Sequence, residues 1–214
     1  LPTGIRISSQ LAEILDKLVQ HLVKERYQSA DDVLHDLNPT DVQFSPQGVP
    51  LASEKEIDYS RLRDLLAAGN WKDANEETRQ KMLEVMGQQQ RDYLDNEDIQ
   101  RFPCTDLRTI NELWGYYSGD RFGFSVQKRI WKDEGGKPGV YNLAVYEKVG
   151  DRVGWRENDN WKVYSELTFS SDSVLGHLPL GMSLGWGTGA IEFVGVEGAV
   201  EVDCLFSRIE DCEL

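Results

Sequence analysis

The sequence predicts a mainly α-helical chain, and two observations carry that prediction. Apolar residues return every three or four positions in several stretches, which is the spacing of one buried helix face. The clearest such stretch starts at Thr105 or Asp106, either of which can cap it, and ends at Ser118-Gly119. Its apolar positions are Leu107, Ile110, Leu113, Trp114 and Tyr117.

Two helices are predicted within residues 5–37. The second begins at Ser29, with Asp32 placed for a capping box. Ser8 or Ser9 can cap the first helix. Its apolar face consists of Ile7, Leu11, Ile14, Leu15, Leu18, Leu22 and Val23. We therefore expect residues 1–38 to form a helical pair.

Residues 39–56 are predicted to be a linker. They contain prolines at positions 39, 46 and 50 and show no helical period. Pro39 ends the second helix, because the residue before a proline is disfavoured in the helical conformation. We expect a larger helical domain to follow over residues 57–180.

Several helices are expected in that domain. Asp58 caps the first, which Gly69-Asn70 ends, and Trp71 to Val85 forms the next. A loop or a helix start is predicted at Gln88 to Arg91, and short helices are predicted near 93–99 and 140–149. The segment Phe122-Gly123-Phe124 brings two rings close together. It leads into a helix over 125–131, where Gln127, Lys128 and Arg129 are expected to face water or a ligand.

The last part of the chain, residues 181–214, reads as a glycine-rich C-terminal extension. Six glycines lie between 181 and 198, so irregular structure or short strands are expected there. The run 185–189 only mimics a phosphate-binding loop, because no Lys-Ser or Lys-Thr follows it. Residues 205–209 are expected to form a helical turn that closes against the domain.

The composition excludes some classes of function. A formal charge of −14 over 214 residues argues against general nucleic-acid binding, which needs a surplus of Lys and Arg. No apolar run approaches the roughly 20 residues that span a bilayer, and no signal peptide is visible. The first residue, Leu1, is not an initiator methionine, so a fragment, a processed product and an alternative start all remain open.

No catalytic or metal-binding arrangement is recognisable. Cys104, Cys204 and Cys212 form no metal-ligand spacing, and we expect reduced thiols in a cytosolic compartment, with a Cys204–Cys212 bridge as the alternative. The three histidines are dispersed, and His177 is expected to be structural rather than an axial metal ligand. Because no nucleophile, base or carboxylate pair can be assigned, we expect a protein that is not an enzyme.

A series of short motifs resembles the Genomes Uncoupled Four family, porphyrin-binding accessory proteins of magnesium chelatase in chlorophyll synthesis. The order and spacing of these motifs are kept from about Ile57 to Pro179. The motifs are Asp58-Tyr59, Gly69-Asn70-Trp71-Lys72-Asp73-Ala74, Glu77-Thr78-Arg79, Phe102-Pro103-Cys104-Thr105-Asp106-Leu107, Arg121-Phe122-Gly123-Phe124-Ser125-Val126-Gln127-Lys128, Val153-Gly154-Trp155-Arg156 and Gly176-His177-Leu178-Pro179.

The resemblance implies a compact tetrapyrrole-binding domain with an open groove. A porphyrin offers two apolar faces and two carboxylates, which suit aromatic rings and arginines. The residues implied are Arg79 and Arg91 for the carboxylates and Tyr164, Trp161, Phe122 and Phe124 for the rings. The alternative for Arg79 and Arg91 is pairing with Glu76 or Asp95 on the helix surface, and the alternative for the two phenylalanines is the core.

The chain departs from the family after Gly176-His177-Leu178-Pro179. Better-known members carry basic residues soon after this motif, whereas residues 180–186 here contain no Lys or Arg. Arg208 is the remaining basic candidate on that side. We expect Trp186 to supply a stacking surface in place of the lost charge.

A second resemblance concerns the N-terminal pair. Leu11, Ile14-Leu15 and residues 25–30 resemble the last two helices of a serine/threonine protein kinase domain. No glycine-rich loop, HRD or DFG motif accompanies them, so this chain has no kinase activity of its own. A ribbon-helix-helix start at residues 4–8 is a further alternative, which the acidic charge disfavours.

Together these observations predict a non-catalytic protein that binds protoporphyrin IX, its magnesium form or a linear tetrapyrrole, with no cofactor required. The resemblance implies regulation of chlorophyll synthesis through the magnesium-chelatase large subunit, or sensing for an attached signalling domain. It further implies a monomer in a cyanobacterial type of cytoplasm, with contact to photosynthetic membranes as an additional expectation. The alternative is a protein-interaction module that no longer binds pigment.

Overall fold

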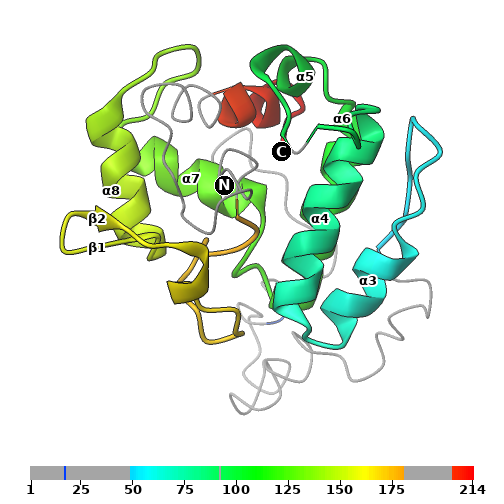
Figure 1. Ribbon diagram of the computed structural model, residues 1–214, viewed down its shortest axis with the longest axis horizontal. Coiled ribbons are helices and arrows are strands. Elements are labelled where there is room, and N and C mark those ends of the chain that lie inside the picture. Colours follow the sequence, from blue (N-terminus) through cyan, green and yellow to red (C-terminus); the bar gives the residue numbers. More distant parts are fainter. Residues whose placement is uncertain (1–16, 18–48, 92, 181–203) are drawn as a thin grey trace. The chain divides into compact units, whose positions relative to one another are not determined.

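The computed structural model describes residue 17 and residues 49–91, 93–180 and 204–214. The chain divides into two compact units, Leu1–Gly48 and Val49–Leu214. The second unit holds all the elements labelled in Figure 1. Apart from Lys17, which is helical, the predicted N-terminal pair lies outside the described residues, and so do most of the glycine-rich extension and Trp186.

The second unit is built mainly of helices, which confirms the predicted fold class (Figure 1). They are α3 (Ser60–Ala67), α4 (Trp71–Val85), α5 (Asn96–Gln100), α6 (Cys104–Ser118), α7 (Phe124–Asp133) and α8 (Leu143–Val153). A two-stranded hairpin, β1 (Arg156–Glu157) and β2 (Asn160–Trp161), and the short helix η2 (Tyr164–Glu166) follow. A last helix covers residues 204–211.

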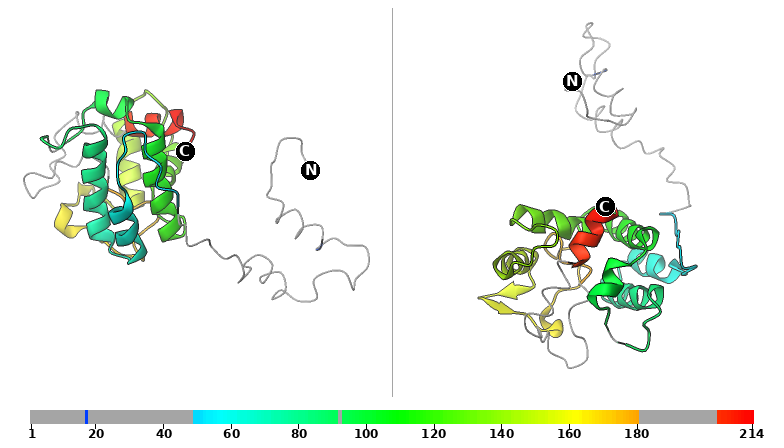
Figure 2. Two further views of the ribbon diagram at one scale, coloured as in Figure 1. Left: turned by 90° about the vertical axis from the view of Figure 1, so that its right-hand side faces the viewer. Right: turned by 90° about the horizontal axis from the view of Figure 1, so that it is seen from above.

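Helices α3, α4 and α6 pack together, with α3 in contact with both of the others (Figures 1 and 2). The apolar spacing of α4 brings Trp71 and Ala74 onto its buried face. Trp71 lies 6.1 Å from Trp114 of α6 and 5.4 Å from Phe122 between ring centroids. The Trp114 indole N–H donates to the Thr78 hydroxyl at 2.9 Å, so this aromatic cluster also satisfies its buried polar group.

The start of α6 differs from the sequence prediction. Pro103, not Thr105 or Asp106, is the N-cap residue, and no side chain caps the helix. Asp106 is instead fully buried and accepts hydrogen bonds from the Tyr59 hydroxyl at 2.9 Å and the Glu54 backbone N–H at 3.0 Å. Because Thr109 also donates to the Ala52 carbonyl, residues 49–56 pack on α6 and belong to this unit rather than to a linker.

The turn between α6 and α7 is held by the Gly176-His177-Leu178-Pro179 segment. The Gly123 N–H donates to the Leu178 carbonyl at 2.9 Å. Gln127, expected to face water or a ligand, is 1% exposed and donates to the Gly176 and Pro179 carbonyls. That expectation is wrong because the segment supplies two buried carbonyls that need a donor.

His177 has the structural role expected from the sequence. Its Nδ1 donates to the Val153 carbonyl at 2.6 Å, and the Trp155 indole N–H donates to the His177 carbonyl at 2.9 Å. Burial lowers the pKa of His177, since a charged imidazole would lose its hydration. The segment thereby joins the end of α8 to the turn before α7.

The C-terminal helix also closes against the domain, as predicted. Leu205, Phe206 and Ile209 are buried, and Phe206 lies 5.3 Å from Trp131 of α7. A disulfide joins Cys212 to Cys104, the first residue of α6. The expectation of three reduced thiols is therefore wrong, and so is the alternative Cys204–Cys212 bridge. The partner in the disulfide is 108 residues away in the sequence, beyond the reach of any local spacing rule.

Candidate functional site

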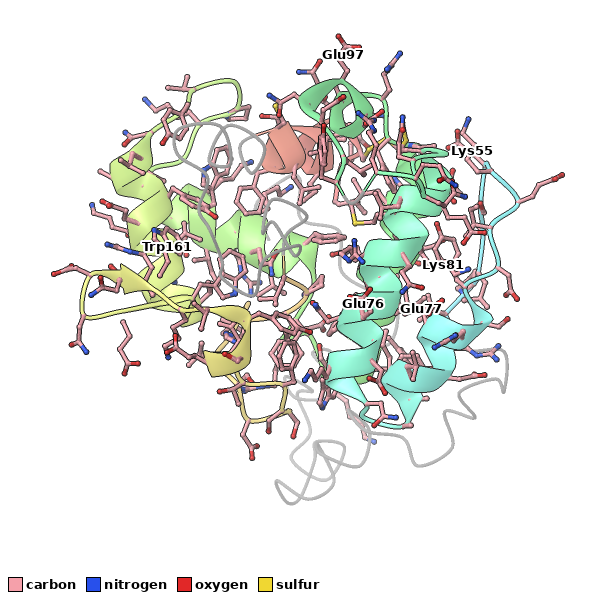
Figure 3. All side chains as sticks on the ribbon, viewed as in Figure 1. Lys55, Glu76, Glu77, Lys81, Glu97 and Trp161 are labelled. Atoms are coloured by element: carbon pink, nitrogen blue, oxygen red, sulfur yellow. A yellow bond between two sulfur atoms is a disulfide. The ribbon has the colours of Figure 1, made fainter. Side chains whose placement is uncertain are left out.

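One face of α4 carries polar side chains that do not pack against α3. Lys72, Asn75, Glu76 and Arg79 recur at three- and four-residue spacing, which aligns them along the helix. Figure 3 shows Glu76 on one side of α4 and Glu77 on the side toward α3, where Glu77 pairs with Arg61 at 3.1 Å. The face formed by Lys72, Asn75, Glu76 and Arg79 is here called the α4 face.

Tyr164 of η2 and Phe169 lie beside the α4 face. Their ring centroids are 5.1 Å apart, and the Lys72 ammonium lies 5.8 Å from the Tyr164 centroid and 5.9 Å from that of Phe169. Partial burial and, next in size, the Glu76 carboxylate raise the pKa of the Tyr164 phenol to about 12. The phenol is therefore neutral at neutral pH. Two rings and a cation therefore lie at the same place.

Asn75 fixes the next segment to this face. The side chain is 2% exposed, and its Oδ1 accepts a hydrogen bond from the Leu180 backbone N–H at 2.7 Å. Its amide also lies against the Tyr164 phenol, where it acts as a hydrogen-bond donor that opposes the rise in the pKa of that phenol. Asn75 therefore connects α4 with both residue 180 and η2.

The two predicted carboxylate-binding arginines both have acidic partners in the chain. Arg79 pairs with Glu76 at 2.9 Å, and its side chain is 15% exposed. Arg91 pairs with Asp95 at 3.0 Å and also with Asp98, which together form part of the start of α5. The alternative pairing foreseen from the sequence, with Glu76 and Asp95, is what the structure contains.

The aromatic candidates divide between the surface and the core. Trp161 on β2 is half-buried and stacks on Tyr146 of α8, with centroids 4.9 Å apart. Gly150 permits this contact, because a Cβ there would come within 2.6 Å of the Trp161 ring. Phe122 and Phe124 are 0% and 1% exposed. Both rings lie in the core, which is the alternative that the sequence offered for them.

Arg208 lies on the C-terminal helix, where its Nε donates to the Phe102 carbonyl at 2.9 Å. Of the predicted site residues, the structure brings together Arg79 and Tyr164, through Lys72 and Asn75. Arg91 instead pairs with Asp95 at the start of α5, and Trp161 packs on Tyr146 of α8. Lys72, Asn75 and Phe169 were missed, although the positions 72, 75 and 79 share helical spacing that could have indicated them.

A hollow of about 320 Å³ lies at the hairpin, and it has a different character. Its lining is Glu157, Asn158, Asn160, Trp161, Lys162 and Glu166. Lys162 already pairs with Glu157 at 3.2 Å, so the remaining carboxylate disfavours an anionic ligand there. Within the described residues, no group of three or more His, Cys, Asp or Glu side chains could hold a metal ion.

Comparison with known proteins then connects the chain to a family. The sequence model described as GUN4-like matches residues 52–192, which is well over half of the chain. The chain belongs to the GUN4-like family. This confirms the resemblance seen in the sequence, and the match begins within the segment that packs on α6.

Relatives of the GUN4-like chain come from photosynthetic organisms. A Ycf53-like protein of Synechocystis is 32% identical over 180 residues, covering 78% of this chain and 74% of that protein. The chloroplastic tetrapyrrole-binding protein of Arabidopsis thaliana is 35% identical over 134 residues, covering 57% of this chain and 48% of that protein. The solved structure of GUN4 from Chlamydomonas reinhardtii superposes with a TM-score of 0.56 at 28% identity, covering 77% of this chain and 96% of that one.

Among the helices of this GUN4-like chain that lie in the described ranges, none combines the length and apolar character that crossing a bilayer requires.

Proposed function

We propose that this chain is a non-catalytic tetrapyrrole-binding protein whose ligand contacts the α4 face and the neighbouring Tyr164 and Phe169 rings. Family membership and the tetrapyrrole-binding Arabidopsis relative support the ligand class. The observation that carries the location is the cluster of Lys72, Tyr164 and Phe169, because it combines ring surface with a cation that has no carboxylate partner among the ion pairs of the described residues.

The chemistry of a tetrapyrrole fits this cluster. Its macrocycle faces are apolar, and removing them from water contributes about 25 cal/mol per Å² before ordering costs. Its carboxylates need cations, and Lys72 is exposed while Arg79 lies two turns further along the same helix face.

The output of binding is proposed from the family rather than from the site. We infer regulation at the magnesium-chelatase step of chlorophyll synthesis, with protoporphyrin IX or its magnesium form as ligand and the chelatase large subunit as partner. A linear tetrapyrrole is an alternative ligand. The resemblance of the N-terminal segment to the end of a kinase domain supports a variant in which the pigment signal passes to an attached domain. A cytoplasmic monomer that contacts photosynthetic membranes completes this proposal.

A second candidate function is favoured by the arginines. Arg79 is tied to Glu76, and Arg91 to Asp95 and Asp98, which lowers the attraction that either offers to a ligand carboxylate. A chain that has lost pigment binding and serves as a protein-interaction module would show this pattern of internal pairing.

The deciding experiment is a titration of the purified chain with protoporphyrin IX and its magnesium form. Tryptophan quenching and the Soret band are followed together, since six tryptophans report on the domain. We expect saturable one-to-one binding that Tyr164→Leu weakens about three- to tenfold. The matched control is Tyr116→Leu, at an exposed tyrosine of α6.

Equal weakening by the two tyrosine substitutions would remove the location from the proposal. No saturable binding by a chain with native circular dichroism would contradict pigment binding itself and favour the interaction module.

A further inference from the structure

The Cys104–Cys212 disulfide joins the start of α6 to the end of the chain and differs from the other contacts of the C-terminal helix. It is a covalent bond, whereas the neighbouring contacts between this helix and residues 100–108 are hydrogen bonds. Arg108 donates to the Cys212 carbonyl at 2.9 Å, and Arg208 donates to the Phe102 carbonyl at 2.9 Å. The C-terminal helix therefore runs along residues 100–108 with a contact at each of its turns.

The other side of this helix rests on α7. Phe206 packs on Trp131, and Glu210 pairs with Lys128 at 3.0 Å and Lys132 at 2.6 Å. The two lysines lower the pKa of Glu210 through their hydrogen bonds to its carboxylate. The covalent bond is therefore added to a docking surface that is already complementary in shape and charge.

The helix itself is too short to persist without that surface. It spans residues 204–211, whereas isolated helices shorter than about 12–15 residues are marginal in water. Its order therefore depends on how firmly it is docked. The disulfide closes a long loop, which raises the effective concentration of the helix at its docking surface.

The two bonded cysteines differ in exposure. Cys212 is 3% exposed, whereas Cys104 is only partly buried and lies at the first position of α6. A thiolate released at that position is stabilised by the unpaired N–H groups of the helix N-terminus. These features favour attack on Cys104 and its later departure as a thiolate.

We propose that Cys104–Cys212 is a redox-modification site at which a dithiol reductant loosens the C-terminal helix from α6 and α7. A thiolate of the reductant attacks Cys104 Sγ, the protein S–S bond breaks, and Cys212 leaves as a thiolate that takes a proton from water. The second thiolate of the reductant then attacks its own sulfur in the mixed disulfide and releases Cys104. The protein gains two electrons and two protons, and the reductant becomes a disulfide.

Loosening changes the surface of α7. Trp131, now 4% exposed, loses the Phe206 ring, and Lys128 and Lys132 lose the Glu210 carboxylate. The reduced form thereby presents an indole between two lysines, a surface that the oxidised form covers. This inference does not depend on the proposed pigment function.

The test uses the full chain in two states, oxidised by diamide and reduced by dithiothreitol. Alkylation with a maleimide under denaturing conditions, read by mass, counts thiols: one is expected after oxidation and three after reduction. Native-state hydrogen exchange then measures residues 204–214. We expect reduction to speed exchange there at least about tenfold, with α3 and α4 unchanged.

Matched cysteine variants separate the site from general damage. Cys204→Ser should respond to dithiothreitol as the wild type does, because Cys204 is not in the disulfide. Cys104→Ser/Cys212→Ser should show fast exchange in 204–214 with or without reductant. Three reactive thiols after diamide, or unchanged exchange of the 204–214 segment on reduction, would overturn the proposal. Protection of α3 and α4 in the double variant shows that the rest of the domain has folded.

Discussion

The α4 face and the C-terminal helix are held in opposite ways. Around the helix, polar groups find partners within the protein, as Arg108, Arg208 and Glu210 show. On the α4 face, the Lys72 ammonium lies near two rings without an ion pair in the described residues. The first arrangement is typical of a region selected for stability. The second arrangement keeps a cation beside ring surface, which a ligand with apolar faces and carboxylates requires.

The largest expected effect comes from removing the covalent bond of the C-terminal helix. The Cys104→Ser/Cys212→Ser variant should lose about 4–5 kcal/mol of unfolding free energy. This value follows from chain entropy, because the two cysteines of the disulfide are 108 residues apart and the bond closes a long loop in the unfolded chain. Denaturant unfolding monitored by circular dichroism measures this. Cys204→Ser, changed in the same solvent, should stay within about 0.5 kcal/mol of the wild type. A double variant as stable as the wild type would show that noncovalent docking is sufficient.

The next effect should come from the one buried anchor of the α4 face. Asn75→Ala removes the acceptor for the Leu180 N–H, and we expect a loss of about 1–3 kcal/mol in unfolding free energy. Gln80→Ala, at an exposed position of the same helix, is the matched control. Equal unfolding free energies for the two variants would mean that water replaces Asn75 as the acceptor of the Leu180 N–H. Asn75 would then not be an anchor, in contrast to the expectation above.

A pH effect is expected from His177, in the segment that joins the end of α8 to the turn before α7. Burial lowers the pKa of His177 below its unfolded value of about 6.5. Above that pH both states are neutral and the group contributes nothing. Below that pH, His177 is protonated in the unfolded chain but stays neutral in the native state. The unfolding free energy therefore falls by up to about 1.4 kcal/mol per pH unit.

Comparing unfolding free energies at pH 7 and pH 5.5 for the wild type and His177→Gln measures this effect. The variant should lose less on acidification than the wild type does. An identical loss in both would assign the acid sensitivity to carboxylates instead.

The smallest expected effect concerns Lys72. Lys72→Gln should leave unfolding free energy within about 0.5 kcal/mol, since the side chain is exposed. It should weaken protoporphyrin binding about three- to fivefold, the value of an exposed ion pair of up to about 1 kcal/mol. Lys148→Gln on α8 is the control, and the dimethyl ester of protoporphyrin IX should bind the wild type and Lys72→Gln equally. A difference that persists with the ester would mean that Lys72 acts without contacting a carboxylate.

Local patterns allowed much of the helical framework to be predicted. The helix over Trp71–Val85 agrees in both bounds, and Gly119 ends α6 in the left-handed conformation, as its position predicted. Where the prediction failed, tertiary contacts had decided the outcome. Asp106 does not cap the helix but accepts a hydrogen bond from the Tyr59 hydroxyl. Gln127 is buried and donates to two backbone carbonyls. Neither partner lies within reach of a sequence window.

The site was less accessible to sequence reasoning than the fold. Arg79 was found through family resemblance, and its pairing with Glu76 follows from ordinary helix spacing. Tyr164 lies near Lys72, 92 positions earlier in the sequence, only because the helices from α5 to α8 and the hairpin fold between them. The hairpin itself consists of two strands of two residues each, too short to give an alternating pattern.

The Cys104–Cys212 bond also alters how the chain transmits force. In the oxidised state, a load applied beyond Cys212 passes through the sulfur atoms into the first turn of α6 and bypasses residues 105–211. A handle or surface attached at Leu214 is thus, in mechanical terms, attached close to the Asp106 network that holds Tyr59 and residues 49–56. Stretching from the C-terminus would test the α6 junction first, and only after reduction would the rest of the domain bear the tension.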